Sequence, residues 1–424
     1  MSSFIVTGGH PLSGSVRAHG AKNSVLPILA ATILCNGQSV IHNCPELSDV
    51  DSSIRILRHL GCEAYREGTA VIVDSSTMDR VDIPDCLMRE MRSSVVFLGA
   101  ILARAGKADM SFPGGCELGP RPIDLHLSAL RELGATIKEE GGNISCGSGG
   151  GSGSGASGLV GREINLSFPS VGATENIILA ASTAAGTTKI NNAAREPEIE
   201  DLQAFMRACG AKVSGAGSST VVIEGTKSLR AAEHSIIPDR IVAATLLMAA
   251  AITGGDVTVQ GIVPEHIASV TGLLADTGCR LDIGKDSVRL TGNGRPRAMR
   301  QIRTMPYPGF PTDTQAQLMA VATVAEGTTV FVETIFESRY RHAGELQRMG
   351  ADIKVEGRVA VVCGVKRLSG ARVSATDLRG GAALVVAALG AAGESVISEL
   401  HHIDRGYERL EETLSSLGSD IKRV

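Results

Sequence analysis

The chain has 424 residues, a net charge of -4, and few aromatic side chains: eight Phe, four Tyr and no Trp. This length exceeds what one hydrophobic core usually supports, so we expect two domains. The near balance of charge and the shortage of stacking side chains argue against nucleic acid as a partner and favour a small-molecule ligand.

The nine cysteines are scattered, with no CxxC or metal-ligand spacing, so we expect neither a disulfide framework nor a metal site. Most free cysteines are small buried hydrophobes, and we expect this of all but one of them. The amino-terminal stretch lacks a basic region followed by an apolar run, and no apolar stretch reaches membrane-spanning length. The sequence therefore predicts a cytoplasmic protein with no membrane partner.

Six copies of one pattern run along the chain. In each copy a helix-like segment ends at a glycine, and a short strand-like run follows. The glycines are spaced by 73, 76, 68, 72 and 68 residues and are Gly61, Gly134, Gly210, Gly278, Gly350 and Gly418. Each copy suggests an α/β unit of about 70 residues that must assemble with others to bury its apolar faces. Three units per domain is the natural division.

A second series interleaves with the first. Six Ala-rich apolar helices each run through Gly into a β-branched strand, at residues 28–41, 97–112, 178–190, 246–259, 318–331 and 384–397. Because these helices are apolar nearly all round, we expect them inside each domain with sheets packed outside. Their amino-terminal ends would then favour an anionic ligand.

The first candidate site residues precede the first Ala-rich helix. Lys22 combines a cation with the free N-H groups of a helix start, and Asn23 follows it. A solvated surface lysine is the alternative.

The segment 112–126 is rich in Pro and Gly around Cys116, which predicts a loop able to close as a lid. With Arg121 nearby, this thiol could act as a proton donor or as a nucleophile. His126 has no spacing partner for a metal, so we interpret it as a polar neighbour. The Gly/Ser-rich stretch 146–158 is interpreted as a flexible loop without chemistry.

Three charged residues in the second half are ambiguous from the sequence alone. Asp313 lies between two prolines and an Ala-rich helix, where helix capping explains it as well as chemistry does. Arg379 and Arg405 closely follow Asp377 and Asp404, so surface ion pairs explain both equally well.

Eight segments together resemble the UDP-N-acetylglucosamine enolpyruvyl transferase family, in the family's order and essentially from end to end. They are residues 20–34, 113–127, 168–181, 192–202, 310–317, 333–342, 375–384 and 401–411. The resemblance implies an inside-out α/β barrel with two domains, each of three βαβαββ repeats. It places 1–20 and 236–424 in the domain with both termini, and 21–235 in an inserted domain.

The resemblance also implies the reaction. The enolpyruvyl group of phosphoenolpyruvate moves to the 3'-hydroxyl of UDP-N-acetylglucosamine by addition and elimination, with release of phosphate. Cys116 would deliver a proton to the methylene carbon and could form a covalent adduct, and Asp313 would be the base. Lys22 and Arg405 complete the implied catalytic set. No cofactor or metal is implied, and we expect a monomer or weak homo-oligomer.

The implied binding residues fall into two groups. Those for phosphoenolpyruvate are Lys22, Arg92, Arg121, Arg379 and Arg405. Those for UDP-N-acetylglucosamine are Asn23, Arg92, Arg121, Pro122, Ile123, Asp124, Leu125, Ser170, Val171, Gly172, Asp313 and Ile335, with Arg339 as a supporting cation. Phe168 and Pro169 depart from the lysine and valine of some family members, so a lysine contact to the nucleotide cannot be assumed.

Three other functions were weighed. A sister enolpyruvyl transferase acts on shikimate 3-phosphate, and the segment 113–127 argues against it. A non-catalytic paralogue that binds UDP-sugar and regulates through partners is disfavoured by the intact Lys22, Cys116, Asp313 and Arg405. A nucleic-acid end-processing protein built from similar units is disfavoured by composition.

Overall fold

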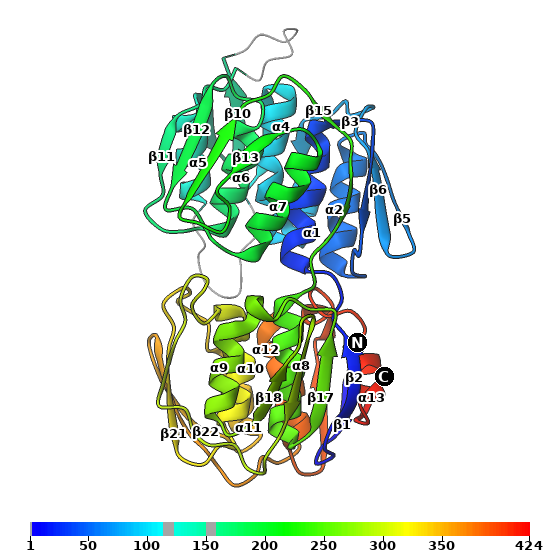
Figure 1. The fold of residues 1–424 in the computed structure, drawn as a ribbon, viewed down its shortest axis with the longest axis vertical. Coiled ribbons are helices and arrows are strands. Elements are labelled where there is room, and N and C mark those ends of the chain that lie inside the picture. Colours follow the sequence, from blue (N-terminus) through cyan, green and yellow to red (C-terminus); the bar gives the residue numbers. More distant parts are fainter. Residues whose placement is uncertain (1, 113–122, 150–157) are drawn as a thin grey trace. The chain divides into compact units, whose positions relative to one another are not determined.

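The computed structural model describes residues 2–112, 123–149 and 158–424. These residues form two compact units. The terminal unit comprises 2–19 and 238–424 and contains both ends of the chain, and the inserted unit is the described part of 20–237 (Figure 1).

Each unit contains three four-stranded sheets that share one pairing pattern. A parallel pair of strands continues into two antiparallel strands. In hydrogen-bonded order, the sheets of the inserted unit are β16 (Glu233–Ser235), β4 (Gln38–His42), β6 (Ala70–Asp74) and β5 (Glu63–Glu67); β7 (Asp82–Ile83), β8 (Lys107–Ser111), β10 (Asn143–Ser148) and β9 (Ala135–Glu140); and β11 (Glu163–Asn165), β12 (Thr187–Asn191), β14 (Thr220–Glu224) and β13 (Lys212–Ser214). A short pair, β15 (Leu229–Arg230) and β3 (Cys35–Asn36), accompanies them.

The terminal unit repeats this arrangement with strands from both ends of the chain. Its sheets are β2 (Ser13–Arg17), β17 (Asp256–Gln260), β19 (Ser287–Thr291) and β18 (Arg280–Ile283); β20 (Gln301–Arg303), β21 (Thr328–Val332), β23 (Val359–Cys363) and β22 (Asp352–Glu356); and β24 (Arg372–Ser374), β25 (Glu394–Ser398), β1 (Phe4–Thr7) and β26 (Asp420–Arg423). Strand pairing does not join the sheets to one another within the described ranges. Packing around the helices therefore holds them together.

The helices form two series. The inner series is α1 (Lys22–Ala31), α4 (Phe97–Ala105) and α6 (Val171–Ala181) in the inserted unit, and α8 (Arg240–Thr253), α10 (Gln315–Ala322) and α12 (Leu378–Gly390) in the terminal unit. The second series is α2 (Ser48–His59), α5 (Asp124–Glu132), α7 (Pro197–Ala208), α9 (Ala268–Asp276), α11 (Arg341–Arg348) and α13 (Leu410–Ser416). Further short helices are α3 (Asp85–Glu90) and the 3-10 turns η1 (Thr32–Leu34), η2 (Arg92–Val96), η3 (Pro264–Ile267), η4 (Thr312–Thr314) and η5 (Leu400–His402).

The prediction that a helix ends at each of the six glycines is confirmed. All six glycines follow a helix of the second series with φ between +90° and +97°. A side chain with a Cβ rarely adopts this conformation, and glycine supplies it without strain. The local sequence therefore fixes where each of these helices ends and the next strand begins.

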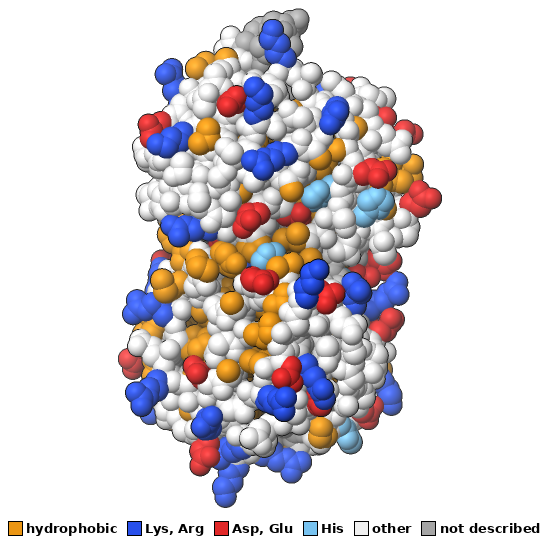
Figure 2. Space-filling model, in the orientation of Figure 1, with side chains coloured by type: hydrophobic (Ala, Val, Ile, Leu, Met, Phe, Trp, Pro, Cys, Tyr) orange, Lys and Arg blue, Asp and Glu red, His pale blue; other side chains and the backbone are white. Residues whose placement is uncertain are grey.

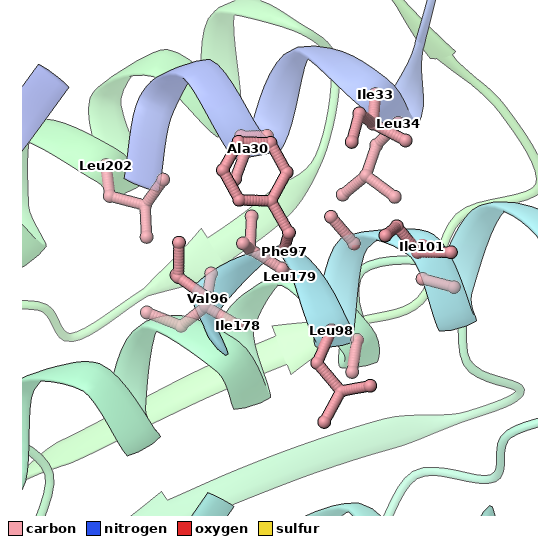
Figure 3. Packing of buried hydrophobic residues seen from close by; sticks show 14 of the residues in the cluster. Ala30, Ile33, Leu34, Val96, Phe97, Leu98, Ile101, Ile178, Leu179 and Leu202 are labelled. Carbon is pink, nitrogen blue, oxygen red and sulfur yellow. The ribbon is translucent and has the colours of Figure 1, made fainter. Parts of the chain in front are cut away.

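The Ala-rich helices are buried, as predicted. Every residue of α8 from Ile241 to Ile252 is buried. In the inserted unit, Figure 3 shows Phe97 of α4 among side chains such as Ala30 of α1 and Leu179 of α6. Small residues let these helices approach closely: a Cβ at Gly99 would lie 2.5 Å from a carbonyl oxygen of the neighbouring helix.

Two sequence predictions about local structure are wrong. The sequence predicts a loop over 146–158, but Cys146 to Ser148 form the end of β10 and pair with β8 and β9. Residues 150–157 of this stretch lie outside the described residues. Main-chain pairing needs no side chain, so a Gly/Ser composition does not exclude it. Cys86 is exposed and Cys363 is partly exposed, whereas both were expected to be buried.

The surface carries both signs of charge. On the face shown in Figure 2, basic and acidic side chains are interspersed over each unit, in keeping with 41 basic and 45 acidic residues. No helix in the described part of the chain is both long and apolar enough to cross a membrane.

Candidate active site

Asp313 is the centre of a charged cluster in the terminal unit. It lies in η4, directly before α10, and its side chain is 26% exposed. One carboxylate oxygen lies 3.0 Å from Nη2 of Arg339, and the other lies 3.4 Å from Nη2 of Arg379. Both arginine side chains are almost fully buried, at 2% and 4% exposure. The cap position of α10 is taken by Thr314, and Asp313 stands one residue earlier.

Arg379 is held in place by its own helix and by an aromatic ring. Asp377 caps α12 by accepting hydrogen bonds from the backbone N-H groups of Arg379 (3.1 Å) and Gly380 (3.0 Å). The guanidinium carbon of Arg379 lies 5.5 Å from the ring centre of Tyr407. A surface ion pair with Asp377 was one explanation of Arg379, and this is wrong because the arginine is buried and pairs with Asp313 instead.

Tyr407 joins the three inner helices of the terminal unit at this cluster. Its hydroxyl is 2.9 Å from the hydroxyl of Thr245 on α8 and accepts from Nε2 of Gln317 on α10 at 2.9 Å. Since Arg379 is in the first turn of α12, the amino-terminal parts of all three helices converge on the ring. Buried hydrogen bonds of this kind fix the positions of the groups that make them.

The helix ends of this unit are less open to anions than the sequence suggested. Asp239 accepts hydrogen bonds from the N-H groups of Ile241 (2.8 Å) and Val242 (3.0 Å) at the start of α8, and Asp377 does the same for α12. These carboxylates occupy N-H groups that an anion would need. Positive charge at this end of the unit therefore comes from guanidinium groups.

Arg405 follows η5 and is partly exposed. The neighbouring Asp404 binds Arg423 through both carboxylate oxygens, at 2.7 and 3.0 Å. Ile335 lies just beyond β21, where its N-H donates to Oε1 of Glu333 at 2.8 Å.

In the inserted unit, Lys22 opens α1 and forms an ion pair with Asp49. Nζ lies 2.8 Å from Oδ2, and the two side chains are only 12% and 2% exposed. The alternative of a solvated surface lysine is therefore wrong. Asn23 occupies the next position of the helix, and the cap residue Ala21 makes no side-chain hydrogen bond to the helix start.

A hydrogen-bond network connects α4, α5 and α6. Nδ1 of His126 on α5 lies 2.7 Å from Nδ2 of Asn176 on α6, and Oδ1 of Asn176 accepts from the N-H of Gly99 at 2.7 Å. A Cβ at Gly172 would lie 3.0 Å from Cε1 of His126, so glycine permits this close approach. His126 is thus the polar neighbour that the sequence predicted.

This network brings two predicted groups near each other within one unit. Ser170 caps α6 by accepting from the N-H of Ala173 at 3.3 Å, and Val171 and Gly172 begin the helix. At the start of α5, the cap residue Ile123 is buried, Asp124 is exposed and Leu125 is partly buried.

Several predicted site residues cannot be placed. Cys116, Arg121 and Pro122 lie outside the described residues, and so does the side chain of Arg92 at the start of η2. Across the described ranges, no three His, Cys, Asp or Glu side chains gather as the ligands of a metal ion would.

Two titratable residues near the predicted ones were given no role from the sequence. Burial raises the pKa of Glu175 on α6 well above its usual range, and Glu198 and Glu196 on α7 and at its cap raise it further. Burial lowers the pKa of His342 on α11 to about 4. Both residues belong to segments that carried the family resemblance, which was the available signal.

Comparison with known proteins gives one consistent result. A sequence model of the EPSP synthase (3-phosphoshikimate 1-carboxyvinyltransferase) family matches residues 6–414. The chain is 55% identical over its whole length to UDP-N-acetylglucosamine 1-carboxyvinyltransferase 2 of Caldanaerobacter subterraneus, all of which is covered. It is 50% identical to UDP-N-acetylglucosamine 1-carboxyvinyltransferase 1 of Symbiobacterium thermophilum, covering 99% of this chain and 95% of that one.

Solved structures agree on the fold. The enolpyruvyl transferase NikO from Streptomyces tendae superposes with a TM-score of 0.87 at 28% identity, covering 100% of this chain and 99% of that one. An EPSP synthase from Acinetobacter baumannii gives a TM-score of 0.76 at 18% identity, with complete coverage of both chains. The second likeness concerns the fold alone. The predicted fold class, that of the enolpyruvyl transferases, is confirmed.

Proposed function

The chain belongs to the EPSP synthase family, and within it to the UDP-N-acetylglucosamine 1-carboxyvinyltransferases, and from this membership we propose its reaction. The enzyme transfers the enolpyruvyl group of phosphoenolpyruvate to the 3'-hydroxyl of UDP-N-acetylglucosamine and releases phosphate. The observation that supports this best is the pairing of Asp313 with Arg339 and Arg379, a partly exposed carboxylate backed by two buried cations.

In the addition step, Asp313 takes the proton of the sugar hydroxyl while the hydroxyl oxygen forms a bond to C2 of phosphoenolpyruvate. Cys116 delivers a proton to the methylene carbon, which becomes a methyl group. In the elimination step, the bond from C2 to the phosphate oxygen breaks and phosphate leaves with the proton that Asp313 had taken up. The methyl group returns a proton to the Cys116 thiolate, which restores the double bond and the starting state of both residues. Cys116 can also form a covalent adduct with phosphoenolpyruvate.

Cations hold the anionic groups of the substrate during both steps. We assign the phosphate and carboxylate of phosphoenolpyruvate to Lys22, Arg121 and Arg405, with Arg92 and Arg379 stabilising charge. The buried pair of Lys22 with Asp49 supports this assignment, since it fixes the ammonium group at a helix start. The pair at Asp313 likewise fixes Arg379.

The nucleotide sugar is assigned to the helix starts of the inserted unit. Its contacts are Asn23, Ile123 to Leu125, and Ser170 to Gly172, with Ile335 and Asp313 near the sugar. The hydrogen bonds among His126, Asn176 and Gly99 hold α5 beside α6, which supports the assignment of Ile123 to Leu125 and Ser170 to Gly172 to one ligand. As part of this proposal, the enzyme acts in the cytoplasm on a peptidoglycan precursor and thereby affects cell shape and division. Fosfomycin, an epoxide directed at thiols, inactivates it through Cys116.

Phosphate release from phosphoenolpyruvate tests the proposal. We expect release with UDP-N-acetylglucosamine and none with shikimate 3-phosphate. Release with shikimate 3-phosphate alone would identify the sister activity, for which the family description is the supporting observation. Binding of UDP-N-acetylglucosamine without any release would identify a non-catalytic binding protein.

A further inference from the structure

We propose that Glu333 is a positioning residue for the reaction, and that it sets the places of both Asp313 and the segment 335–336. This inference rests on the proposed function. Glu333 directly follows β21 and is 1% exposed. It does not touch the reacting atoms in this proposal, but acts through the groups that do.

The carboxylate of Glu333 accepts four hydrogen bonds. Oε1 accepts from the hydroxyl of Thr304 (2.9 Å) and from the N-H groups of Ile335 (2.8 Å) and Phe336 (3.1 Å). Oε2 accepts from the hydroxyl of Thr312 at 3.0 Å. All four donors are neutral. A buried carboxylate is expensive unless it is hydrogen-bonded, so these contacts are strongly favoured and their geometry is narrow.

One branch of this arrangement reaches Asp313. Thr312 is the residue before Asp313, and its carbonyl oxygen accepts from Nη2 of Arg339 at 3.0 Å. The same nitrogen lies 3.0 Å from Oδ1 of Asp313. Glu333 thus holds the Thr312 side chain while Arg339 holds its carbonyl oxygen and the adjacent carboxylate. The position of the proposed base is fixed from two sides.

The second set of contacts connects Glu333 to Arg339 through Phe336. The N-H of Phe336 is bound by Glu333, and the guanidinium carbon of Arg339 lies 5.5 Å from the Phe336 ring centre. Ile335, the proposed sugar contact, is held by the same carboxylate oxygen. A shift of Glu333 would therefore move the sugar contact and the base together.

The internal repeats show what this position does elsewhere. Asn43 follows β4 and donates from Nδ2 to the carbonyl oxygen of Ile236 at 2.9 Å. Asn192 follows β12 and donates to the carbonyl oxygen of Leu166 at 2.9 Å. Each asparagine ties the end of a central strand to the segment after its parallel edge strand. An asparagine side chain is thus sufficient to hold these two segments together by one hydrogen bond.

Glu333 does more than its counterparts. It makes the equivalent tie by accepting from Thr304, which follows the edge strand β20. It also accepts hydrogen bonds from the hydroxyl of Thr312 and from the N-H groups of Ile335 and Phe336. Thr312 directly precedes Asp313, Ile335 is the proposed sugar contact, and Phe336 lies beside Arg339. The additional contacts therefore indicate a role for Glu333 beyond holding the sheet.

The test compares Glu333→Ala with Glu333→Gln and with the matched control Asn192→Ala. Since misplacement by about 1 Å can cost about a hundredfold, we expect Glu333→Ala to lower kcat by about a hundredfold and raise KM for UDP-N-acetylglucosamine about tenfold. KM for phosphoenolpyruvate should change less than KM for UDP-N-acetylglucosamine, since Glu333 reaches Arg379, a proposed contact to phosphoenolpyruvate, only through Asp313. Glu333→Gln should keep much more of kcat than Glu333→Ala, because the amide oxygen has two lone pairs for the donors around Oε1 and the amide nitrogen can donate to the Thr312 hydroxyl.

Asn192→Ala removes the same kind of strand-end tie without a path to Asp313, so its kcat and both KM values should match those of the wild type. Thr312→Val removes only the contact to Oε2. It should lower kcat about tenfold with KM unchanged, and it decides the matter if Glu333→Ala does not fold. Wild-type kinetics in folded Glu333→Ala or in Thr312→Val would overturn the inference alone. A wild type that releases no phosphate with UDP-N-acetylglucosamine would overturn the proposed function and the inference with it.

Discussion

Replacing Asp313 separates chemistry from binding. In Asp313→Ala the carboxylate that lies 3.0 Å from Arg339 and 3.4 Å from Arg379 is removed. If Asp313 is the base, kcat should fall by about a hundredfold to ten-thousandfold. At about 1.36 kcal/mol per tenfold, this corresponds to about 2.7 to 5.4 kcal/mol of transition-state stabilisation. Affinity for UDP-N-acetylglucosamine should change by less than about threefold, since one partly exposed carboxylate contributes little to holding so large a ligand.

The same substitution also affects stability. Removing one partner of a buried ion pair costs about 3 to 5 kcal/mol, because the remaining charge is left without its partner. Asp313 is 26% exposed, so water screens the two arginines in its absence and we expect about 1 to 2 kcal/mol. For a unit of this size that is a drop in Tm of about 2 to 8 °C. Asp313→Asn keeps the shape of the side chain and should lose less stability for the same loss of kcat.

Three measurements distinguish these effects. Phosphate release at saturating substrates gives kcat, calorimetric titration gives nucleotide affinity, and urea unfolding gives the stability change. All are made well below the melting temperature, so that the folded fraction does not differ. A loss confined to affinity, with kcat intact, would refute the assignment of Asp313 as the base and make it a binding residue.

Three further outcomes are expected. Cys116→Ala should abolish phosphate release while UDP-N-acetylglucosamine still binds, and Cys116→Asp should keep some turnover and resist fosfomycin; inactivation of Cys116→Asp by fosfomycin at the wild-type rate would contradict this. Gly134→Ala, at φ +97° in open space, should cost about 1 to 2 kcal/mol on urea unfolding, and Gly61→Ala should cost more, because its Cβ would also lie 2.4 Å from a carboxylate oxygen of Asp79. Burial holds the pKa of His342 near 4, below its ordinary value of 6.5, so the folded state disfavours its protonation and stability should be lost as the pH falls from about 6.5 to 4. His342→Gln should flatten that loss, and equal pH dependence in both proteins would contradict the assignment.

The repeats could be predicted from the sequence because their signals are local. A glycine such as Gly210 ends its helix through its own backbone conformation, at φ +96°. A helix such as α8 is apolar on every side, and only a buried place satisfies it. Neither inference needs to know which distant segments meet.

The family resemblance named the members of the charged cluster as site residues, but the contacts among them could not be predicted because they join distant parts of the chain. Asp313 is 26 residues from Arg339 and 66 residues from Arg379. From the sequence alone, an ion pair with Asp377, two residues earlier, explains Arg379 equally well. The Asp377 carboxylate instead accepts hydrogen bonds from the N-H groups at the start of α12, because these groups have no acceptor within the helix.

The terminal unit allows a comparison of Asp313, the proposed base, with two aspartates that cap their helices. Asp239, Asp313 and Asp377 each stand at or just before the start of an inner helix. The first and third accept hydrogen bonds from backbone N-H groups of the helix they begin. At α10 the cap position is taken by Thr314, and Asp313, one residue earlier in η4, pairs with Arg339 and Arg379. This shift by one residue, relative to Asp239 and Asp377, brings the Asp313 carboxylate to the two arginines. Such a place suits its proposed role as the base for a substrate hydroxyl.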